Sequence, residues 1–180
     1  AGINAARKAA GSLPVTIKRS DRFVGVMIDD LTSRGVTEPY RMFSSRSEFR
    51  LSLRADNADL RLTPLAIQFG CASAERARSF ENRKRQVESL TRQMADLSTS
   101  PQQARAAGIM VNEDGQRRSA MDILSRANIG FEDLVRLWPV LADAPSEARV
   151  QVETDAKYAV YLERQQASVA DYEARLSAKL

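Results

Sequence analysis

The spacing of apolar residues between Ser73 and Leu97 constrains this fold more than any other feature, because they recur every three, four or seven positions. The stripe consists of Phe80, Val87, Leu90, Met94 and Leu97. This spacing places apolar side chains on one face of an α-helix, and the polar residues between them fill the opposite face. Pro101 follows shortly afterwards and stops the pattern. The sequence therefore predicts a long amphipathic helix packed against other helices.

Helical patterns continue along the rest of the C-terminal half. Shorter helices are predicted at residues 65–69, 102–107, from 119 onward and at 131–138, each bounded by glycine, proline or turn residues. The last helix follows Ala144-Pro145-Ser146 and has a seam at 4-3-4-3-4 spacing, formed by Tyr158, Leu162, Gln165, Val169, Tyr172 and Leu176. Such a seam suits a bundle helix more commonly than a true coiled coil. The predicted fold class is mainly α, a multi-helix bundle-like domain without internal repeats.

The N-terminal part is less regular. Residues 1–8 form an opening helix rich in small residues, and the cluster Gly11-Ser12-Leu13-Pro14 interrupts it. A second helix is predicted from Phe23 to Gly35, with Ser20-Asp21 supplying its N-cap. The chain begins without an initiator methionine and ends in helical pattern, so we interpret it as a piece of a longer protein.

Residues 44–54 fit two structures. Ser45 and Glu48 have the spacing of a helical capping box, whereas Phe49, Leu51 and Leu53 alternate with polar residues as in a strand. The segment is therefore left as a small ambiguous region, helical or β. In either structure, residues spaced by four share one face, which groups Arg46, Arg50 and Arg54.

Composition excludes several kinds of chemistry. The chain has no histidine and one cysteine, Cys71, so histidine-based triads, zinc clusters and internal disulfides are excluded. We interpret Cys71 as a buried or bystander thiol. The neighbouring acids Asp29 and Asp30 point to different sides of a helix, so we expect them to pair with arginine or cap a neighbouring helix rather than act together in catalysis. Apolar runs are too short to span a bilayer, and no signal segment is present. No catalytic or metal-binding residue is assigned.

Positive charge is concentrated in the N-terminal part. Residues 1–70 carry 11 basic and 7 acidic side chains, and 22 of the 27 basic residues are arginine. Between Arg41 and Arg54 there are four arginines and one acid, next to or among the rings of Tyr40, Phe43 and Phe49. Arginine binds phosphates and aromatic rings stack on unpaired bases, so the segment is a candidate nucleic-acid surface. The alternative is a structural ion-pair network of Arg54, Asp56, Asp59 and Arg61.

The same segment resembles a known family. The strings that carry the resemblance are EPYRMFSSR at residues 38–46, EFRL at 48–51 and DNADLRLT at 56–63. Further matches are AGINAA at the start, IDDL at 28–31 and, at 157–166, a segment that begins with Lys157-Tyr158. The whole pattern resembles the GidA (MnmG) family, flavin-dependent tRNA uridine 5-carboxymethylaminomethyl modification enzymes.

The resemblance implies three regions and their roles. Residues 1–19 would be the tail of an upstream flavin-binding domain and a linker, 20–70 the signature segment, and 71–180 a helical domain that engages tRNA or a partner. Gly2 and Asn4 would lie near the flavin of the intact protein. tRNA would be bound by Arg41, Arg46, Arg50, Arg54, Tyr40 and Phe43, with a second face formed by Lys157, Tyr158, Tyr161, Arg164 and Gln165.

The family also implies an activity for the intact protein. That activity would be the carboxymethylaminomethyl modification at C5 of the wobble uridine, position 34 of tRNA, with FAD as cofactor, NADH as reductant and a GTPase as partner. A cytoplasmic homodimer is expected. The part of the protein in this chain would position tRNA and the partner without catalysing the reaction. A helical module for protein interaction or dimerisation, without RNA contact, is the alternative.

Overall fold

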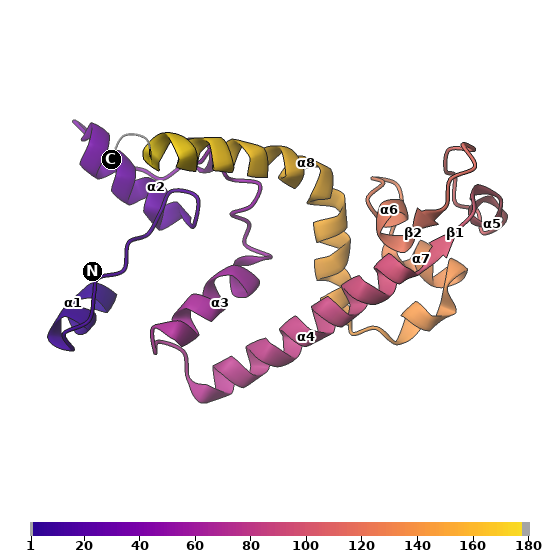
Figure 1. Ribbon diagram of the computed structural model, residues 1–180, viewed down its shortest axis with the longest axis horizontal. Helices are drawn as coiled ribbons and strands as arrows, with labels where there is room; N and C mark the ends of the chain where they lie inside the picture. Colours follow the sequence, from indigo (N-terminus) through magenta and orange to yellow (C-terminus); the bar gives the residue numbers. More distant parts are fainter. Residues whose placement is uncertain (1, 178–180) are drawn as a thin grey trace. The chain divides into compact units, whose positions relative to one another are not determined.

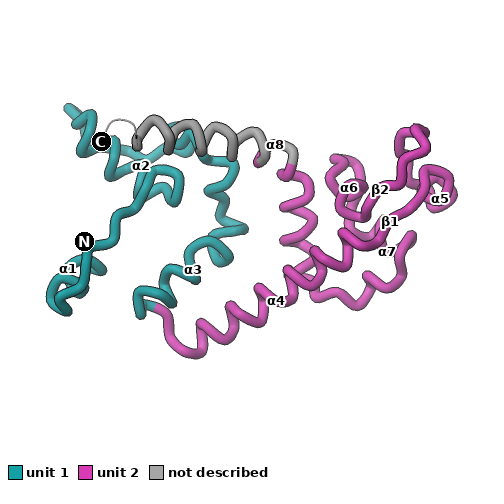
Figure 2. The backbone as a smooth tube through the Cα atoms, in the orientation of Figure 1, with its two compact units in different colours: residues 1–71, 164–180 teal, residues 72–163 magenta. Residues whose placement is uncertain are grey.

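The chain folds into two compact units, shown in teal and magenta in Figure 2. The N-terminal unit comprises residues 1–71 with 164–180, and the C-terminal unit comprises residues 72–163. The computed structural model describes the backbone of residues 2–177 and the side chains of residues 2–159, 161 and 162. Helices dominate both units, which confirms the predicted mainly α fold class.

The C-terminal unit is built on the long helix α4 (Ala74–Asp96). Its other elements follow in chain order (Figure 1): β1 (Ser98–Thr99), α5 (Pro101–Ala106), β2 (Arg118–Ser119), α6 (Ala120–Leu124), α7 (Phe131–Leu137), a 3-10 turn (Pro139–Asp143) and α8 (Ser146–Ser177), which continues past the unit. The two short strands are antiparallel, with Ser98 opposite Ser119 and Thr99 opposite Arg118.

The predicted apolar stripe of α4 forms one wall of a contiguous core. Phe80, Val87, Leu90 and Met94 are buried, and the last three pack into the core cluster. The opposite walls come from α6, α7, the 3-10 turn and the first turns of α8, through Ile123, Leu124, Phe131, Leu134, Leu141, Ala148, Val152 and Ala156. Burial of this apolar surface is the main driving force for the unit, because hydrophobic stabilisation is roughly proportional to the area removed from water.

Serine caps define where these helices begin. The side chain of Ser73 accepts a hydrogen bond from the Arg76 N–H, and Ser100 and Ser119 each form a complete capping box with the residue three positions on. Such caps satisfy backbone N–H groups that the first helical turn leaves free. The sequence patterns of residues 73–97 and 119–122 predicted these boundaries to within a residue or two.

The N-terminal unit contains short helices joined by long connections. Its elements are α1 (Gly2–Ala9), α2 (Phe23–Asp29), a π-helical turn (Asp30–Arg34), a 3-10 turn (Ser44–Arg46) and α3 (Ala58–Gln68). The π-helical turn ends at Arg34 and is capped by Gly35, whose φ of 66° lies in the left-handed region that glycine adopts without strain. The predicted end of this helical segment is therefore correct.

The start of α2 differs from the prediction. Arg22, rather than Ser20-Asp21, occupies the N-cap and makes no side-chain cap. Asp21 instead accepts a hydrogen bond from the Lys18 N–H at 2.9 Å, which tightens the loop before the helix. This loop passes so close to α2 that a Cβ at Gly25 would lie 2.0 Å from the Lys18 carbonyl oxygen. Gly25 is therefore required for the loop to approach the helix.

Helix α3 begins earlier than predicted. The expected start was Leu65, but the helix runs from Ala58 and includes Pro64. Proline within a helix removes one backbone hydrogen bond, yet the helix continues to Gln68 and ends before Gly70, which has φ 70°. The extension brings Arg61 and Thr63 into a helix and places them among the partly buried and buried residues of the unit.

Candidate nucleic-acid interface

A buried arginine, Arg19, organises the polar centre of the N-terminal unit. It lies in the loop before α2 and its side chain is only 5% exposed. Its guanidinium contacts Asp29 at 2.9 Å, Asp30 at 2.7 Å and Glu48 at 3.0 Å, and it donates to the Arg46 carbonyl oxygen at 3.2 Å. One side chain thus ties together the loop, the end of α2 and residues 46–48. The expectation that Asp29 and Asp30 pair with arginine is confirmed.

The electrostatics of this polar centre favour the charged pair. Burial opposes the charge on Arg19, but hydrogen bonds with Asp30, Glu48 and Asp29 outweigh it and raise the pKa of Arg19. The hydrogen bond from Arg19 lowers the pKa of Asp30, against the opposing effect of burial. Burial and the hydrogen bond to Asp30 raise the pKa of Tyr40, so its hydroxyl stays protonated and donates to Asp30 at 2.9 Å.

Two arginines and two aromatic rings form an exposed cluster next to this centre. The Arg46 guanidinium carbon lies 5.0 Å from the centroid of the Tyr40 ring and 5.9 Å from that of Phe43, and Arg41 lies 4.9 Å from the Phe43 centroid. We call these four residues the cation–π cluster. Arg46 and Phe43 are each 45% exposed and Arg41 is also exposed. Unpaired bases stack on aromatic rings and on guanidinium planes, and guanidinium groups also bind phosphates.

Residues 44–54 form neither of the two predicted structures. A 3-10 turn at Ser44–Arg46 is followed by further turns rather than by a longer helix or a strand. Phe49 and Leu53 are buried, and this tight folding replaces regular periodicity. The predicted common face of Arg46, Arg50 and Arg54 is therefore wrong, because the segment has neither helical nor strand periodicity.

The two remaining arginines of the predicted set differ in availability. Arg50 is exposed, and no hydrogen bond or ion pair to it is found among the described residues. The side chain of Arg54 is only 9% exposed, pairs with Asp56 at 2.9 Å and donates to the Leu51 carbonyl oxygen at 3.2 Å. The ion pair of Arg54 with Asp56, which was part of the alternative ion-pair network, is therefore present in the structure.

Arg61 is also engaged inside the unit. It donates to the Asn57 side chain at 3.2 Å and to the Asp21 carbonyl oxygen at 2.7 Å. Burial and the neighbouring charges of Arg22 and Arg54 lower the pKa of Arg61. Its role is to join α3 to the loop before α2.

An open hollow of about 580 Å³ adjoins the cation–π cluster. It is lined by residues 34–40 and by Arg46. Arg34 and residues 35–38 were not among the predicted site residues, and neither was Arg19. The only sequence signal for Arg19 was the neighbouring pair Asp29-Asp30, which was expected to bind an arginine. No sequence pattern pointed to Arg34 as a site residue.

A second hollow, of about 360 Å³, lies beside the start of α1. Gly2, Ile3, Asn4 and Arg22 contribute to its lining, and Arg22 Nε is buried without a hydrogen-bond partner among the described residues. The two polar atoms of the Asn4 side chain both bind the backbone of Val15, at 2.9 and 2.7 Å. Asn4 therefore has a structural task here, and the lining supplies too few free polar groups to hold a flavin by itself.

The second predicted face lies on α8. Lys157 pairs with Glu153 at 2.5 Å, Tyr158 is partly buried and Tyr161 is 56% exposed. The side chains of Arg164 and Gln165 lie outside the described residues, as do those of the seam residues Val169, Tyr172 and Leu176.

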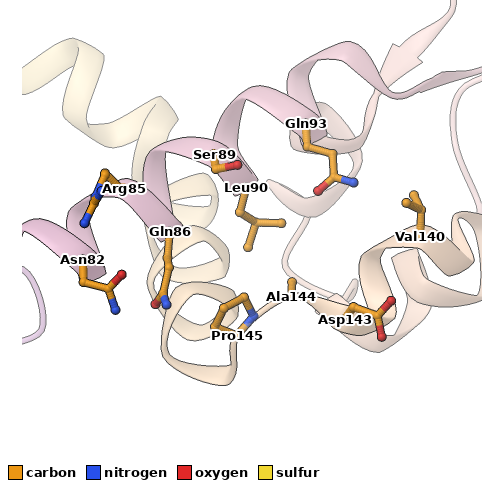
Figure 3. A pocket seen from close by; sticks show the side chains of 10 residues that line it. All are labelled: Asn82, Arg85, Gln86, Ser89, Leu90, Gln93, Val140, Asp143, Ala144 and Pro145. Atoms are coloured by element: carbon orange, nitrogen blue, oxygen red, sulfur yellow. The ribbon is translucent and has the colours of Figure 1, made fainter.

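The C-terminal unit also has a polar groove of about 540 Å³ along α4. In Figure 3, Asn82, Gln86 and Gln93 extend from the helix on one side, and Val140, Asp143 and Pro145 border the other. Amides, one arginine and one carboxylate supply hydrogen-bonding groups, but the lining contains no nucleophile paired with a base. The groove therefore gives no indication of catalysis.

Three further observations concern other kinds of site. Cys71 is exposed, so the buried alternative for this thiol is wrong, and its interpretation as a bystander stays a prediction. Among the described side chains, no group of three or more potential ligands is placed to hold a metal ion. In the same part of the chain, none of the helices has the length and apolar character needed to cross a membrane.

The chain is similar to one protein family and to individual proteins of bacteria. The family described as "tRNA modifying enzyme MnmG/GidA C-terminal helical domain" matches residues 74–166, just over half of the 180 residues. A protein of Granulibacter bethesdensis named "tRNA uridine 5-carboxymethylaminomethyl modification enzyme MnmG" is 46% identical over 165 residues. A Bacillus subtilis protein of the same name is 39% identical over 169 residues.

The match covers most of this chain and a small part of each relative. The aligned region is 92% of this chain and 26% of the Granulibacter protein, and 91% and 27% for the Bacillus protein. The crystal structure of Aquifex aeolicus GidA (form II) superposes with a TM-score of 0.81 at 32% identity, over 96% of this chain and 27% of that one. The chain thus spans about a quarter of the length of these relatives.

Proposed function

The chain belongs to the MnmG/GidA family, and from that membership we propose that it is the part of a tRNA-modifying enzyme that holds tRNA. The exposed cation–π cluster and Arg50 form the proposed contact surface. Arg41, Arg46 and Arg50 would bind phosphates, while Tyr40 and Phe43 would pack against bases or ribose. Arg54 and Arg61 serve the protein's own structure in this proposal.

One observation carries the proposal. Arg41, Arg46 and Arg50 are exposed on a segment with few acids, although Arg19 and Arg54 nearby are fully engaged by carboxylates. No ion pair of Arg41 or Arg50 is found among the described residues, and Arg46 lies 4.0 Å from Asp30, beyond hydrogen-bond distance, so these three side chains have donors available for a polyanion. The backbone of the cluster is also held in place, because Arg19 donates a hydrogen bond to the Arg46 carbonyl oxygen. A cluster held in this way loses little conformational freedom when it binds a ligand.

For the intact protein we propose the modification at C5 of the wobble uridine with FAD, NADH and a GTPase partner, as a cytoplasmic homodimer. FAD would supply the redox chemistry from the upstream domain. This chain would contribute placement of the anticodon region and of the partner rather than catalysis. Its second face would add Lys157, Tyr161, Arg164 and Gln165, and Gly2 would lie near the flavin.

The experiment is a titration of the chain with tRNA at several salt concentrations. Each phosphate contact releases counterions, so the affinity should fall steeply with salt. Arg50→Ala and Arg41→Ala should each reduce the slope of log affinity against log salt by about one. Arg136→Ala is the matched control, because that side chain is 71% exposed in the C-terminal unit. Binding that ignores both salt and these arginines would contradict the proposal.

Protein interaction without RNA contact is the second candidate function. The heptad-like spacing of apolar residues on α8, which includes Leu162, supports this candidate, because such a seam packs against another helix. Sedimentation velocity separates the two functions. A concentration-dependent dimer that is lost in Leu162→Asp, together with no binding of tRNA, would favour assembly.

A further inference from the structure

We propose that the hollow lined by residues 34–40 and Arg46 is a subsite for one unpaired nucleotide of the bound RNA. Arg34 and Arg46 would hold its phosphate, and the stacked plane of Tyr40 and Arg46 would face its base. The inference rests on the proposed function, because it assigns a ligand to a site next to the cation–π cluster. Of the residues that line it, only Tyr40 and Arg46 were among the predicted tRNA-binding residues.

The backbone creates the hollow. The π-helical turn ends at Arg34, and Gly35 then takes a positive φ of 66°, which turns the chain away from the helix. Residues 35–39 follow without regular structure and all are exposed. The resulting space of about 580 Å³ lies within the range of pockets that hold small ligands.

The charges around the hollow suit an anion at its rim. Asp30, the buried acid nearby, already accepts hydrogen bonds from Arg19 at 2.7 Å and Tyr40 at 2.9 Å. Arg46 lies 4.0 Å from the same carboxylate, beyond hydrogen-bond distance, and its side chain is 45% exposed. Arg34 is exposed, and no hydrogen bond or ion pair to it is found among the described residues. Two guanidinium groups at the rim therefore have donors left for a phosphate.

The wall of the hollow offers a fixed surface for stacking. The Arg46 guanidinium carbon lies 5.0 Å from the Tyr40 ring centroid, and the Tyr40 hydroxyl is held by Asp30. Because the ring is anchored before any ligand arrives, little conformational freedom is lost on binding. A base that is paired in a duplex already stacks on its neighbours and cannot use this surface, whereas an unpaired base can.

The lining of the hollow also includes groups that could recognise the edge of a base. None of the hydrogen bonds found among the described residues uses the backbone of Val36, Thr37 or Glu38. The Glu38 carboxylate lines the same space and is exposed, so it can accept an N–H from a base. An acid at this place also disfavours a second phosphate, which fits one nucleotide rather than a run of backbone.

The test compares two RNA probes of equal length: a hairpin with an unpaired loop and a blunt duplex. The wild-type chain should bind the hairpin about tenfold more tightly, the effect of roughly one stacked base. Val36→Trp fills the hollow from an exposed position, and Arg34→Ala removes a rim cation. Each should abolish most of the hairpin preference. Val150→Trp, at a site 66% exposed in the C-terminal unit, is the matched control and should keep the preference.

The outcomes separate this inference from the proposed function. If Arg50→Ala lowers the affinity for both RNAs equally and Val36→Trp removes only the difference between the two affinities, the subsite is supported. If Val36→Trp leaves the hairpin preference intact, the subsite is wrong although RNA binding stands. If neither RNA binds, the proposed function fails and the inference with it.

A photo-cross-link provides a second measurement that does not depend on the stability of a variant. A thiouridine in the hairpin loop should cross-link within residues 34–40 of the wild-type chain. Cross-links confined to other residues would overturn the subsite.

Discussion

The two units of this protein are stabilised by different kinds of interaction. Among the described residues of the C-terminal unit, a contiguous apolar core runs from Val87 to Ala156, and the buried polar residues are Thr99 and Gln151. Among those of the N-terminal unit, Val26, Phe49 and Leu53 are the buried apolar residues of appreciable size, while Arg19, Asp30, Ser47 and Thr63 are buried polar ones. The described part of the first unit is therefore held by apolar packing, whereas that of the second also depends on buried charges.

The strongest test of this difference is to remove the charge at the polar centre. Arg19→Met would leave the carboxylate of Asp30 buried without its main partner, and breaking a buried ion pair in this way costs about 4 kcal/mol of stability. Hydrogen exchange at the amides of Phe23–Asp29 should accelerate strongly. Fluorescence of Trp138, the single tryptophan, should still report a folded C-terminal unit.

Arg19→Lys serves as the control for that variant. Lysine restores the positive charge but not the planar fork that reaches three carboxylates, so an intermediate loss is expected. Full retention of stability in Arg19→Met would contradict the view that this unit depends on its polar centre.

A cavity in the apolar core gives the converse test. Leu134 is 0% exposed in the C-terminal unit, and truncation to alanine should cost about 3 kcal/mol through lost burial and an unfilled cavity. The Trp138 transition in denaturant should move to lower concentration, whereas exchange of the α2 amides should change little. An equal effect on both units would show that they unfold together.

Low pH should destabilise the N-terminal unit before the C-terminal unit, with a smaller effect than either substitution. The pKa of Asp30 is lowered from its ordinary value of 3.8, so the stability it contributes is complete above about pH 4 and disappears as the pH falls through its lower native value. The protection of the α2 amides from hydrogen exchange, measured relative to the unfolded chain at the same pH, should fall below pH 4 before the fluorescence of Trp138 changes. In Asp30→Asn this acid-dependent step should be absent, and its persistence there would assign it to another carboxylate.

Much of the C-terminal unit could be predicted from its sequence because local signals agree with the fold. The stripe Phe80 to Met94 fixes the buried face of α4, and Ser73 caps its start. The antiparallel pair Ser98–Thr99 and Arg118–Ser119 could not be predicted, since two residues per strand are too few to establish alternation. Helix α3 was predicted too short, at residues 65–69, whereas it begins at Ala58 and contains Pro64, a residue type that usually interrupts helices.

The candidate site could be predicted only in part. Exposure of Arg41, Arg46 and Arg50 follows from a local cluster of charge, and the structure agrees with it. Arg19 could not be predicted, because it lies 29 residues from Glu48 in a loop without periodicity. The grouping of Arg54 with the exposed arginines failed because Asp56, two residues away, already binds it.

The arrangement around Arg19 also limits how this surface can change over generations. Three carboxylates and a backbone carbonyl meet one guanidinium, so a single replacement at the centre leaves several groups stranded at once. Arg34 and Glu38 are exposed, and no hydrogen bond or ion pair to their side chains is found among the described residues, so replacing either leaves no described group without its partner. The charge of these exposed positions can therefore vary between relatives while the centre stays fixed.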